Sequence, residues 1–235
     1  MESKKYIYCA LDFKKLEDCE KILIKIKDYI GGIKLGLEFF IANGLRGAQT
    51  LKKYGLPIFL DLKLNDIPNT VEKAIESALI IKPDLITIHM NCNYLVTNLI
   101  RKKVKNTKLI GVTLLTSLND NDLNKLGINE SSAQYVKRLM KIAIKNRFDG
   151  IVCSPNELKA LKKNLPKNFF LVTPGIRLDS KIKDDQKRIM GPGEAIKNGA
   201  NIIVVGRPIT KSKNPVKIVK DIIKDIEVNK NSKCH

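Results

Sequence analysis

The chain has 235 residues, of which 43% are hydrophobic and 29% charged, so it can bury a large core and is not a disordered protein. Its net charge of +19 comes mainly from lysines spread along the chain, while aromatic residues make up only 6% and tryptophan is absent, so stacking platforms for nucleic-acid bases are scarce. No apolar run approaches the roughly 20 residues of a membrane helix, the five cysteines form no CxxC pair, and residues 1–5 do not resemble a signal peptide. We therefore expect a cytoplasmic protein with neither a membrane nor a nucleic acid as partner.

Eight short runs rich in apolar or β-branched residues predict strands at residues 6–11, 32–37, 57–62, 84–90, 108–115, 150–154, 169–174 and 201–206. In the longer, lysine-rich segments between them, apolar residues recur at steps of three and four, which is typical of amphipathic helices. This spacing is clear in the segments Cys19–Ile30, Val136–Ile144 and Val216–Ile226. No linker or change in composition divides the chain, so we predict one domain over residues 1–235 with a frayed polar tail at 228–235.

Eight strand-like runs, each followed by a helical segment, are the number that a (β/α)₈ barrel, or TIM barrel, requires. A doubly wound parallel sheet also alternates strands and helices, but no GxGxxG follows the first strand and such sheets usually have fewer strands. We therefore predict the barrel. In both folds the functional residues lie at the carboxyl ends of the strands.

Charged residues gather at the end of the third predicted strand. Because side chains alternate along a strand, Asp61 and Lys63 share one face, and in a barrel that face points inward. Charges inside a barrel are costly unless they are paired, and Lys34, Asp66 and Asp12 at neighbouring strand ends can complete an alternating array. A salt-bridge network that only stabilises the barrel mouth is the alternative. Five such residues favour chemistry, because purely structural barrels fill this region with apolar layers.

The last two predicted strands carry a second group of polar residues. Gly206 permits close approach of a ligand to the backbone, and the adjacent Arg207 can bind a phosphate in a bidentate manner. Loops after strands seven and eight form the usual phosphate site of this fold. The long charged segment 177–192 is interpreted as a lid, with Gln186 as an amide donor to the phosphate, although a solvated surface loop is the alternative.

A metal site is not expected. The pair His89-x-x-Cys92 has the spacing of metal ligands but no second pair accompanies it, so a histidine at a strand end is the simpler interpretation.

The segment Asp61-Leu62-Lys63-Leu64-Asn65-Asp66-Ile67-Pro68-Asn69-Thr70 resembles the D-x-K-x-x-D-I-P-x-T signature of the orotidine 5′-phosphate decarboxylase family. Further motifs follow in that family's order, namely Ala10–Asp12, Lys34–Gly36, Leu115–Ser117, Pro174–Arg177, Asp185–Gln186 and Val205–Arg207. The resemblance covers nearly the whole chain and is closest to the bacterial-type, single-function branch. Two segments depart from the pattern: His89–Cys92, where small residues usually follow the histidine, and the region of Gly191 and Gly193, where bulkier residues are common.

The resemblance implies a (β/α)₈ homodimer whose active sites are each completed by the partner subunit. It implies decarboxylation of orotidine 5′-phosphate to UMP, the last step of de novo UMP synthesis, without cofactor or metal. In this reading Lys63 donates the proton and belongs to a charged network with Asp61, Lys34 and Asp66. The residues implied to cross the dimer are Asp66, Ile67 and Thr70.

The same resemblance assigns the contacts with the substrate. Asp12 and Lys34 hold the ribose hydroxyls, Thr116 and Ser117 lie by the pyrimidine, and Pro174 belongs to the substrate-binding set. The phosphate-binding residues are Arg177, Gln186, Gly206 and Arg207.

The implied chemistry accounts for the residue types. Loss of CO₂ leaves a carbanion on a ring carbon. Because the sequence contains no motif for a cofactor that could delocalise this negative charge, the carbanion must be stabilised electrostatically. Flanking carboxylates keep Lys63 charged for this purpose.

Two alternatives stay open. A magnesium-dependent sugar-phosphate decarboxylase or aldolase on the same barrel shares D-x-K-x-x-D and would also use Asp61, Lys63 and Asp66. The net charge of +19 is also compatible with a basic nucleic-acid-binding protein, although we interpret this charge as lysines on solvated helix faces.

Overall fold

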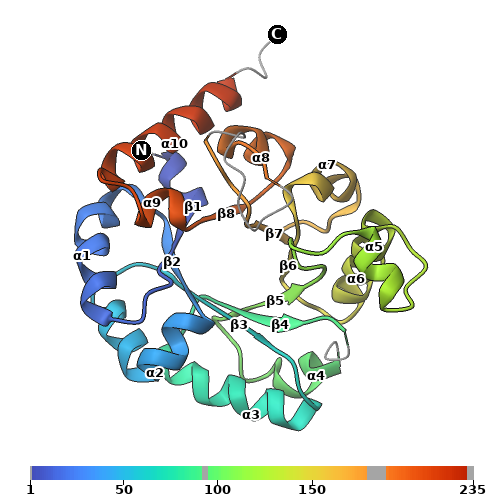
Figure 1. Ribbon diagram of the computed structural model, residues 1–235. Helices are drawn as coiled ribbons and strands as arrows, with labels where there is room; N and C mark the ends of the chain where they lie inside the picture. The colour runs from blue at the N-terminus through green and yellow to red at the C-terminus, as the bar shows by residue number, and fades with distance from the viewer. Residues whose placement is uncertain (1, 92–94, 179–188, 232–235) are drawn as a thin grey trace.

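The computed structural model describes residues 2–91, 95–178 and 189–231, and these form a closed barrel of parallel strands surrounded by helices (Figure 1). The strands pair in chain order and β8 closes on β1, which confirms the predicted (β/α)₈ barrel over the doubly wound sheet. The strands are β1 (Ile7–Ala10), β2 (Gly32–Gly36), β3 (Ile58–Leu64), β4 (Leu85–His89), β5 (Lys108–Val112), β6 (Gly150–Val152), β7 (Phe170–Thr173) and β8 (Ile202–Val205).

The helices form the outer ring (Figure 1). They are α1 (Leu16–Ile26), α2 (Leu37–Lys52), α3 (Pro68–Ala78), α4 (Val96–Ile100), α5 (Asp120–Lys125), α6 (Ser132–Lys145), α7 (Leu158–Leu161), α8 (Pro192–Asn198), α9 (Arg207–Thr210) and α10 (Pro215–Asn231). Short 3₁₀ turns adjoin several of them at Glu2–Tyr6, Lys27–Tyr29, Leu79–Ile81, Pro155–Glu157 and Lys162–Asn164. Within the described ranges, none of the helices is both long and apolar enough to cross a membrane.

Two apolar layers hold the barrel. The larger layer lies between the sheet and the helices and contains the outward-facing strand residues, such as Leu60, Ile86 and Ile88. The smaller layer fills the inside of the barrel and consists of Tyr8, Ala10, Phe59, Leu85, Ile110, Val172, Ile202 and Val204. Because the middle of this inner layer is apolar, inward-pointing charged groups lie toward the ends of the strands.

The pairing of β3 with β4 is irregular at the predicted charged segment. Leu60 pairs with Ile86 and Leu64 with Ile88, so three residues of β3 lie opposite the single residue Thr87 of β4. The two additional residues preserve the alternation of side chains: Leu62 and Leu64 pack against the outer layer, while Asp61 and Lys63 face the inside. The faces predicted from the period of two are therefore correct, although the strand is bulged.

The first four residues of the predicted tail are helical rather than frayed. Residues 228–231 continue α10 as helix, and the remaining residues 232–235 lie outside the described part of the chain. The last turn is tied to the body of the protein, because the Lys230 ammonium donates a hydrogen bond to the Tyr6 hydroxyl at 2.9 Å and lies 4.2 Å from the centre of that ring. Such long-range contacts are invisible in a local polar pattern.

Candidate active site

A cavity of about 640 Å³ opens at the carboxyl ends of the strands. Its lining comes from residues in or just after seven of the eight strands, from β1 through β8 with β4 as the exception. Predicted site residues that it brings together are Asp12, Lys34, Asp61, Lys63, Thr116, Pro174, Arg177, Gly206 and Arg207. Asp12 and Arg207, which lie 195 positions apart in the chain, thus share one cavity, because the barrel collects all strand ends at one rim.

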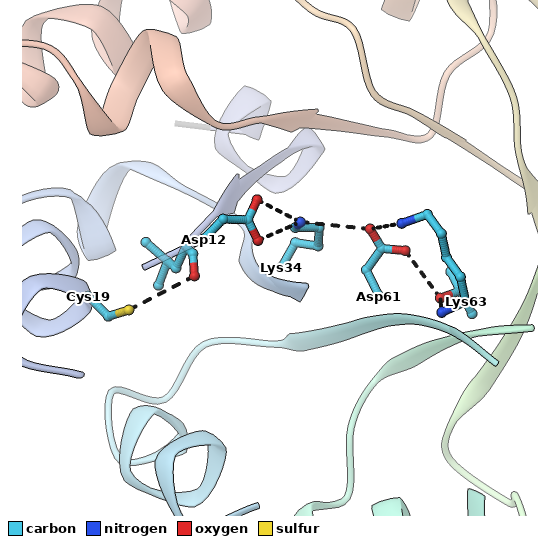
Figure 2. A network of polar contacts seen from close by, with 7 residues as sticks. Asp12, Cys19, Lys34, Asp61 and Lys63 are labelled. Atoms are coloured by element: carbon cyan, nitrogen blue, oxygen red, sulfur yellow. Dashed lines mark hydrogen bonds and ion pairs between the residues drawn. The ribbon is translucent and has the colours of Figure 1, made fainter. Parts of the chain in front are cut away.

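Four of these residues form an alternating line of charges, which we call the charged row: Asp12, Lys34, Asp61 and Lys63 (Figure 2). The Lys34 ammonium lies 2.9 Å from both carboxylate oxygens of Asp12 and 3.7 Å from Oδ2 of Asp61. The Lys63 ammonium donates a hydrogen bond of 2.8 Å to the same Oδ2. Because carboxylates and ammonium groups alternate, the charged row carries no net charge.

The middle of the charged row is more buried than its ends. The side chain of Lys34 is 10% exposed and that of Asp61 13%, against 40% for Asp12 and 32% for Lys63. Removing one member of a buried ion pair costs about 3–5 kcal/mol, because it leaves an uncompensated charge. Partners within the protein therefore fix the row before any ligand arrives.

Glycine at position 36 leaves room for the contact of Asp12 with Lys34 in the charged row. A Cβ atom there would lie 2.6 Å from Oδ1 of Asp12 and 2.6 Å from the Lys34 ammonium nitrogen, closer than such atoms approach in real structures. Gly36 is the N-cap of α2 and has an extended backbone, so only space requires glycine here. The structure thus gives a reason for the glycine of the Lys34–Gly36 motif.

Lys63 has a strained backbone, with φ of +48°. A non-glycine residue in the left-handed region costs on the order of 1–3 kcal/mol, and such strain gathers at functional sites. The Lys63 backbone N–H donates a 2.8 Å hydrogen bond to Oγ1 of Thr87, and that hydroxyl donates to Oδ1 of Asp61 at 3.2 Å. Sequence reasoning missed Thr87, because a threonine inside an apolar run looks like any β-branched strand residue.

A second part of the cavity lining is basic. We call Arg177, Arg207 and Lys211 the basic wall; they follow β7 and β8, and the described lining residues from these elements include no carboxylate. Arg177 is 5% exposed, and its Nη1 donates to the carbonyl oxygen of Ile176 at 2.8 Å. Lys211 was not predicted as a site residue. It follows Arg207 by four residues, and this spacing places two side chains on the same face of a helix, so the sequence did contain a signal for it.

Other lining residues were also missed. Phe13 and Glu38 line the cavity shortly after β1 and β2, and Thr210 lines it as the last residue of α9. They follow the strand-end rule, but no sequence motif distinguished them from their neighbours.

Four predicted residues do not line this cavity, and they are Asp66, Ile67, Thr70 and Ser117. All four are exposed, and the Asp66 carboxylate accepts a hydrogen bond of 2.7 Å from the Ile67 backbone N–H. Gln186 and most of the predicted lid, together with Cys92, lie outside the described residues.

His89 ends β4 beside the charged row. Burial lowers the pKa of its imidazole, and the positive charge of Lys63 lowers it further, while a hydrogen bond with Asn91 opposes both effects. The neutral imidazole is therefore favoured. In the described ranges, no three histidine, cysteine, aspartate or glutamate side chains gather closely enough to hold a metal ion.

Cys19 lies beyond the Asp12 end of the charged row, on the side away from Lys63 (Figure 2), and it is not a cavity-lining residue. Its thiol contacts the Leu11 carbonyl oxygen at 3.9 Å, and burial, with a contribution from the Asp12 charge, raises its pKa to about 12. A thiol with such a pKa is not a nucleophile at neutral pH.

Comparisons with known proteins identify the family of this chain. A family model described as orotidine 5′-phosphate decarboxylase / HUMPS family matches residues 5–222. The orotidine 5′-phosphate decarboxylase of Ehrlichia chaffeensis is 43% identical over 231 residues, 97% of each chain, and that of Erythrobacter litoralis is 41% identical over 217 residues, 92% of this chain and 96% of its own. The crystal structure of orotidine 5′-phosphate decarboxylase from Lactobacillus acidophilus is 33% identical, has a TM-score of 0.81 and covers 94% of this chain and 98% of that one. This chain therefore belongs to the orotidine 5′-phosphate decarboxylase / HUMPS family.

Proposed function

We propose that this protein decarboxylates orotidine 5′-phosphate to UMP and CO₂ in the last step of de novo UMP synthesis, and that it does so in the cytoplasm. Family membership supports the reaction class. The observation that carries the proposal is the alternating charged row, which shares one cavity with the basic wall. The two features match a substrate that has a phosphate at one end and a carboxylate at the other.

The phosphate binds at the basic wall in this proposal. Arg177 and Arg207 offer guanidinium groups that can pair with phosphate oxygens in a bidentate manner, and Gly206 lets the backbone approach them. Gln186 completes the set as an amide donor. The phosphate is remote from the reacting carbon, and its binding energy can order the site and so increase the rate.

The rest of the nucleotide extends toward the charged row. Asp12 and Lys34 bind the ribose hydroxyls, while Thr116 and Pro174 contact the pyrimidine, with Ser117 beside them. This orientation brings the substrate carboxylate to Asp61 and the ring carbon C6 to Lys63.

The reaction breaks the bond between C6 and the carboxylate carbon. The electron pair stays on C6, CO₂ leaves, and the ammonium of Lys63 stabilises the carbanion before giving it a proton. Lys63 then recovers a proton from solvent. Asp61, 2.8 Å from that ammonium, both holds it in place and repels the substrate carboxylate in the ground state.

We propose that the reaction uses no metal ion. The Lys34 ammonium lies between the carboxylates of Asp12 and Asp61, so a positive charge already occupies the position where those carboxylates would ligate a cation. A magnesium-dependent sugar-phosphate enzyme would need free carboxylate oxygens for its metal, whereas Asp61 already pairs with the ammonium groups of Lys34 and Lys63.

The test follows the loss of orotidine 5′-phosphate absorbance on adding purified protein, with and without EDTA. We expect rapid loss at the same rate in both. No loss with folded protein would overturn the proposed reaction and make magnesium with keto-sugar phosphates the next assay. Loss that EDTA abolishes and magnesium restores would overturn the metal-free mechanism alone.

We further propose a homodimer in which Asp66, Ile67 and Thr70 complete the active site of the partner subunit. Their exposure and their absence from their own chain's cavity support this arrangement. Ile67 is 65% exposed, and a second subunit would cover this apolar side chain.

Mixing two inactive variants tests the shared site. Lys63→Ala and Asp66→Ala each disable both sites of their own dimers, but a hybrid dimer has one intact site if Asp66 acts across the interface. Random reassortment should then restore about a quarter of wild-type activity, since half of the dimers are hybrids with one good site of two. If Asp66 serves its own chain, no hybrid site is intact and activity stays absent.

A further inference from the structure

We propose that Thr87 is a positioning residue, which sets the geometry of Lys63 and Asp61 for proton transfer to the substrate. This inference rests on the proposed function and deepens it. Thr87 is not a catalytic residue, because it does not line the cavity and acts only through the two residues that do.

The irregular pairing of β3 with β4 creates the need for such a residue. Thr87 is the only β4 residue opposite the three-residue segment Asp61–Lys63, because the regular pairs on either side are Leu60 with Ile86 and Leu64 with Ile88. A bulge of this kind takes backbone groups out of the ladder, and a buried N–H without a partner is costly. The Thr87 hydroxyl accepts the hydrogen bond of the Lys63 N–H in place of the ladder.

The same hydroxyl also orients the carboxylate of Asp61. Its single hydrogen goes to Oδ1 of Asp61, at 3.2 Å, while Oδ2 receives the Lys63 ammonium at 2.8 Å. One hydroxyl thus bonds to the Lys63 backbone and to the carboxylate that holds the Lys63 side chain. Thr87 is completely buried, so water does not compete for either bond.

These bonds differ from those of an ordinary buried threonine in the same barrel. Thr113, which follows β5, is 1% exposed, and its hydroxyl donates to the Val152 carbonyl oxygen at 2.7 Å. That bond joins two strands without touching the charged row. Thr113 is therefore a matched control for the loss of a buried hydroxyl.

The test compares Thr87→Val, Thr87→Ser and Thr113→Val in the full protein. Valine keeps the shape and removes both bonds, so we expect kcat to fall about 10- to 100-fold, because small misplacements of reacting groups have effects of this size. The KM for orotidine 5′-phosphate and the Kd of UMP should stay within about twofold of wild type, since the phosphate contacts are untouched. Serine restores both bonds and should recover most of kcat, while Thr113→Val should keep the wild-type kcat.

Three outcomes would overturn the inference while the wild type is active: an unchanged kcat in Thr87→Val, equal losses of kcat in Thr87→Val and Thr113→Val, or no rescue by serine. An inactive wild type would instead overturn the proposed function together with this inference. Melting temperature and UMP binding check that each variant folds. If Thr87→Val does not fold, Thr87→Cys replaces it, because a thiol is a much weaker donor of similar size, and the same comparison with serine applies.

Discussion

The charged row and the basic wall line the same cavity, but they differ in the signs of the charges that they bring to it. In the charged row each ammonium lies within 3.7 Å of a carboxylate of the same chain, and the charges cancel. The described lining of the basic wall brings three cationic side chains and no acidic one. The charged row thus combines both signs of charge, whereas the described lining of the basic wall is cationic and suits an anionic group. In the proposed function, the row acts on the reaction step and the wall binds the substrate's phosphate.

The largest loss of catalytic efficiency is expected from removing Lys63, the member of the charged row that donates the proton in the proposed function. Lys63→Ala should lower kcat/KM by about 10⁵-fold or more, because both carbanion stabilisation and proton donation are lost. Folding and UMP binding should persist, since Asp61 keeps Lys34 and Thr87 as partners. Exchange of the C6 hydrogen of UMP with solvent deuterium should stop as well, because it is the reverse of protonation.

The control is Lys217→Ala, which removes an exposed lysine paired with Asp221 on α10 and should change neither measurement. Near-wild-type turnover by Lys63→Ala would refute the proton-donor role.

The next largest loss of catalytic efficiency is expected from removing an arginine of the basic wall. Arg207→Ala should lower kcat/KM for orotidine 5′-phosphate by about 10²- to 10³-fold, which corresponds to the loss of a bidentate charged hydrogen bond. With orotidine, which has no phosphate, wild type and variant should react at the same rate. A variant that slows both substrates equally would show that the phosphate binds elsewhere. Arg138→Ala, which removes an arginine paired with Glu130 on the surface, is the matched control.

A smaller effect is expected from crowding the charged row without removing a charge. Gly36→Ala places a methyl group against the contact of Asp12 with Lys34, so we expect KM to rise by about tenfold through the ribose contacts, the equivalent of one good hydrogen bond. Gly111→Ala on β5 is the control, because its Cβ would crowd the end of another flexible side chain, Met90, which neither belongs to the charged row nor lines the cavity. Equal kinetics of the two variants would exclude a role for the space at Gly36.

The smallest expected effect is a change in the pH dependence of stability, and it concerns His89, next to the charged row. Its folded-state pKa is lowered, so on acidification the unfolded chain binds the proton first, and the free energy of unfolding should fall as the pH drops through the folded-state pKa. Urea denaturation between pH 7.5 and 5.5 should therefore show a steeper loss of stability in wild type than in His89→Gln. Identical slopes would mean that His89 titrates normally in the folded protein.

Much of the site was predictable because it depends on local rules. Alternation along a strand was enough to place Asp61 and Lys63 on the inner face, and the strand-end rule selected Asp12, Arg177 and Arg207. Polar residues directly after apolar runs are visible without knowledge of any partner.

The missed residues depend on contacts between distant segments. The role of Thr87 arises from the shifted register between β3 and β4, and the need for Gly36 arises from Asp12 on another strand. The helical end of the chain depends in the same way on the contact of Lys230 with Tyr6.

The sequence by itself determined the order of the strands and helices and the face on which each side chain lies, because hydrophobic period and residue type are local properties. Tertiary structure decided which strand ends meet, how β3 and β4 are registered and how the strained backbone of Lys63 is held. These features result from closure of the barrel, in which each strand's position is set by the packing of all the others.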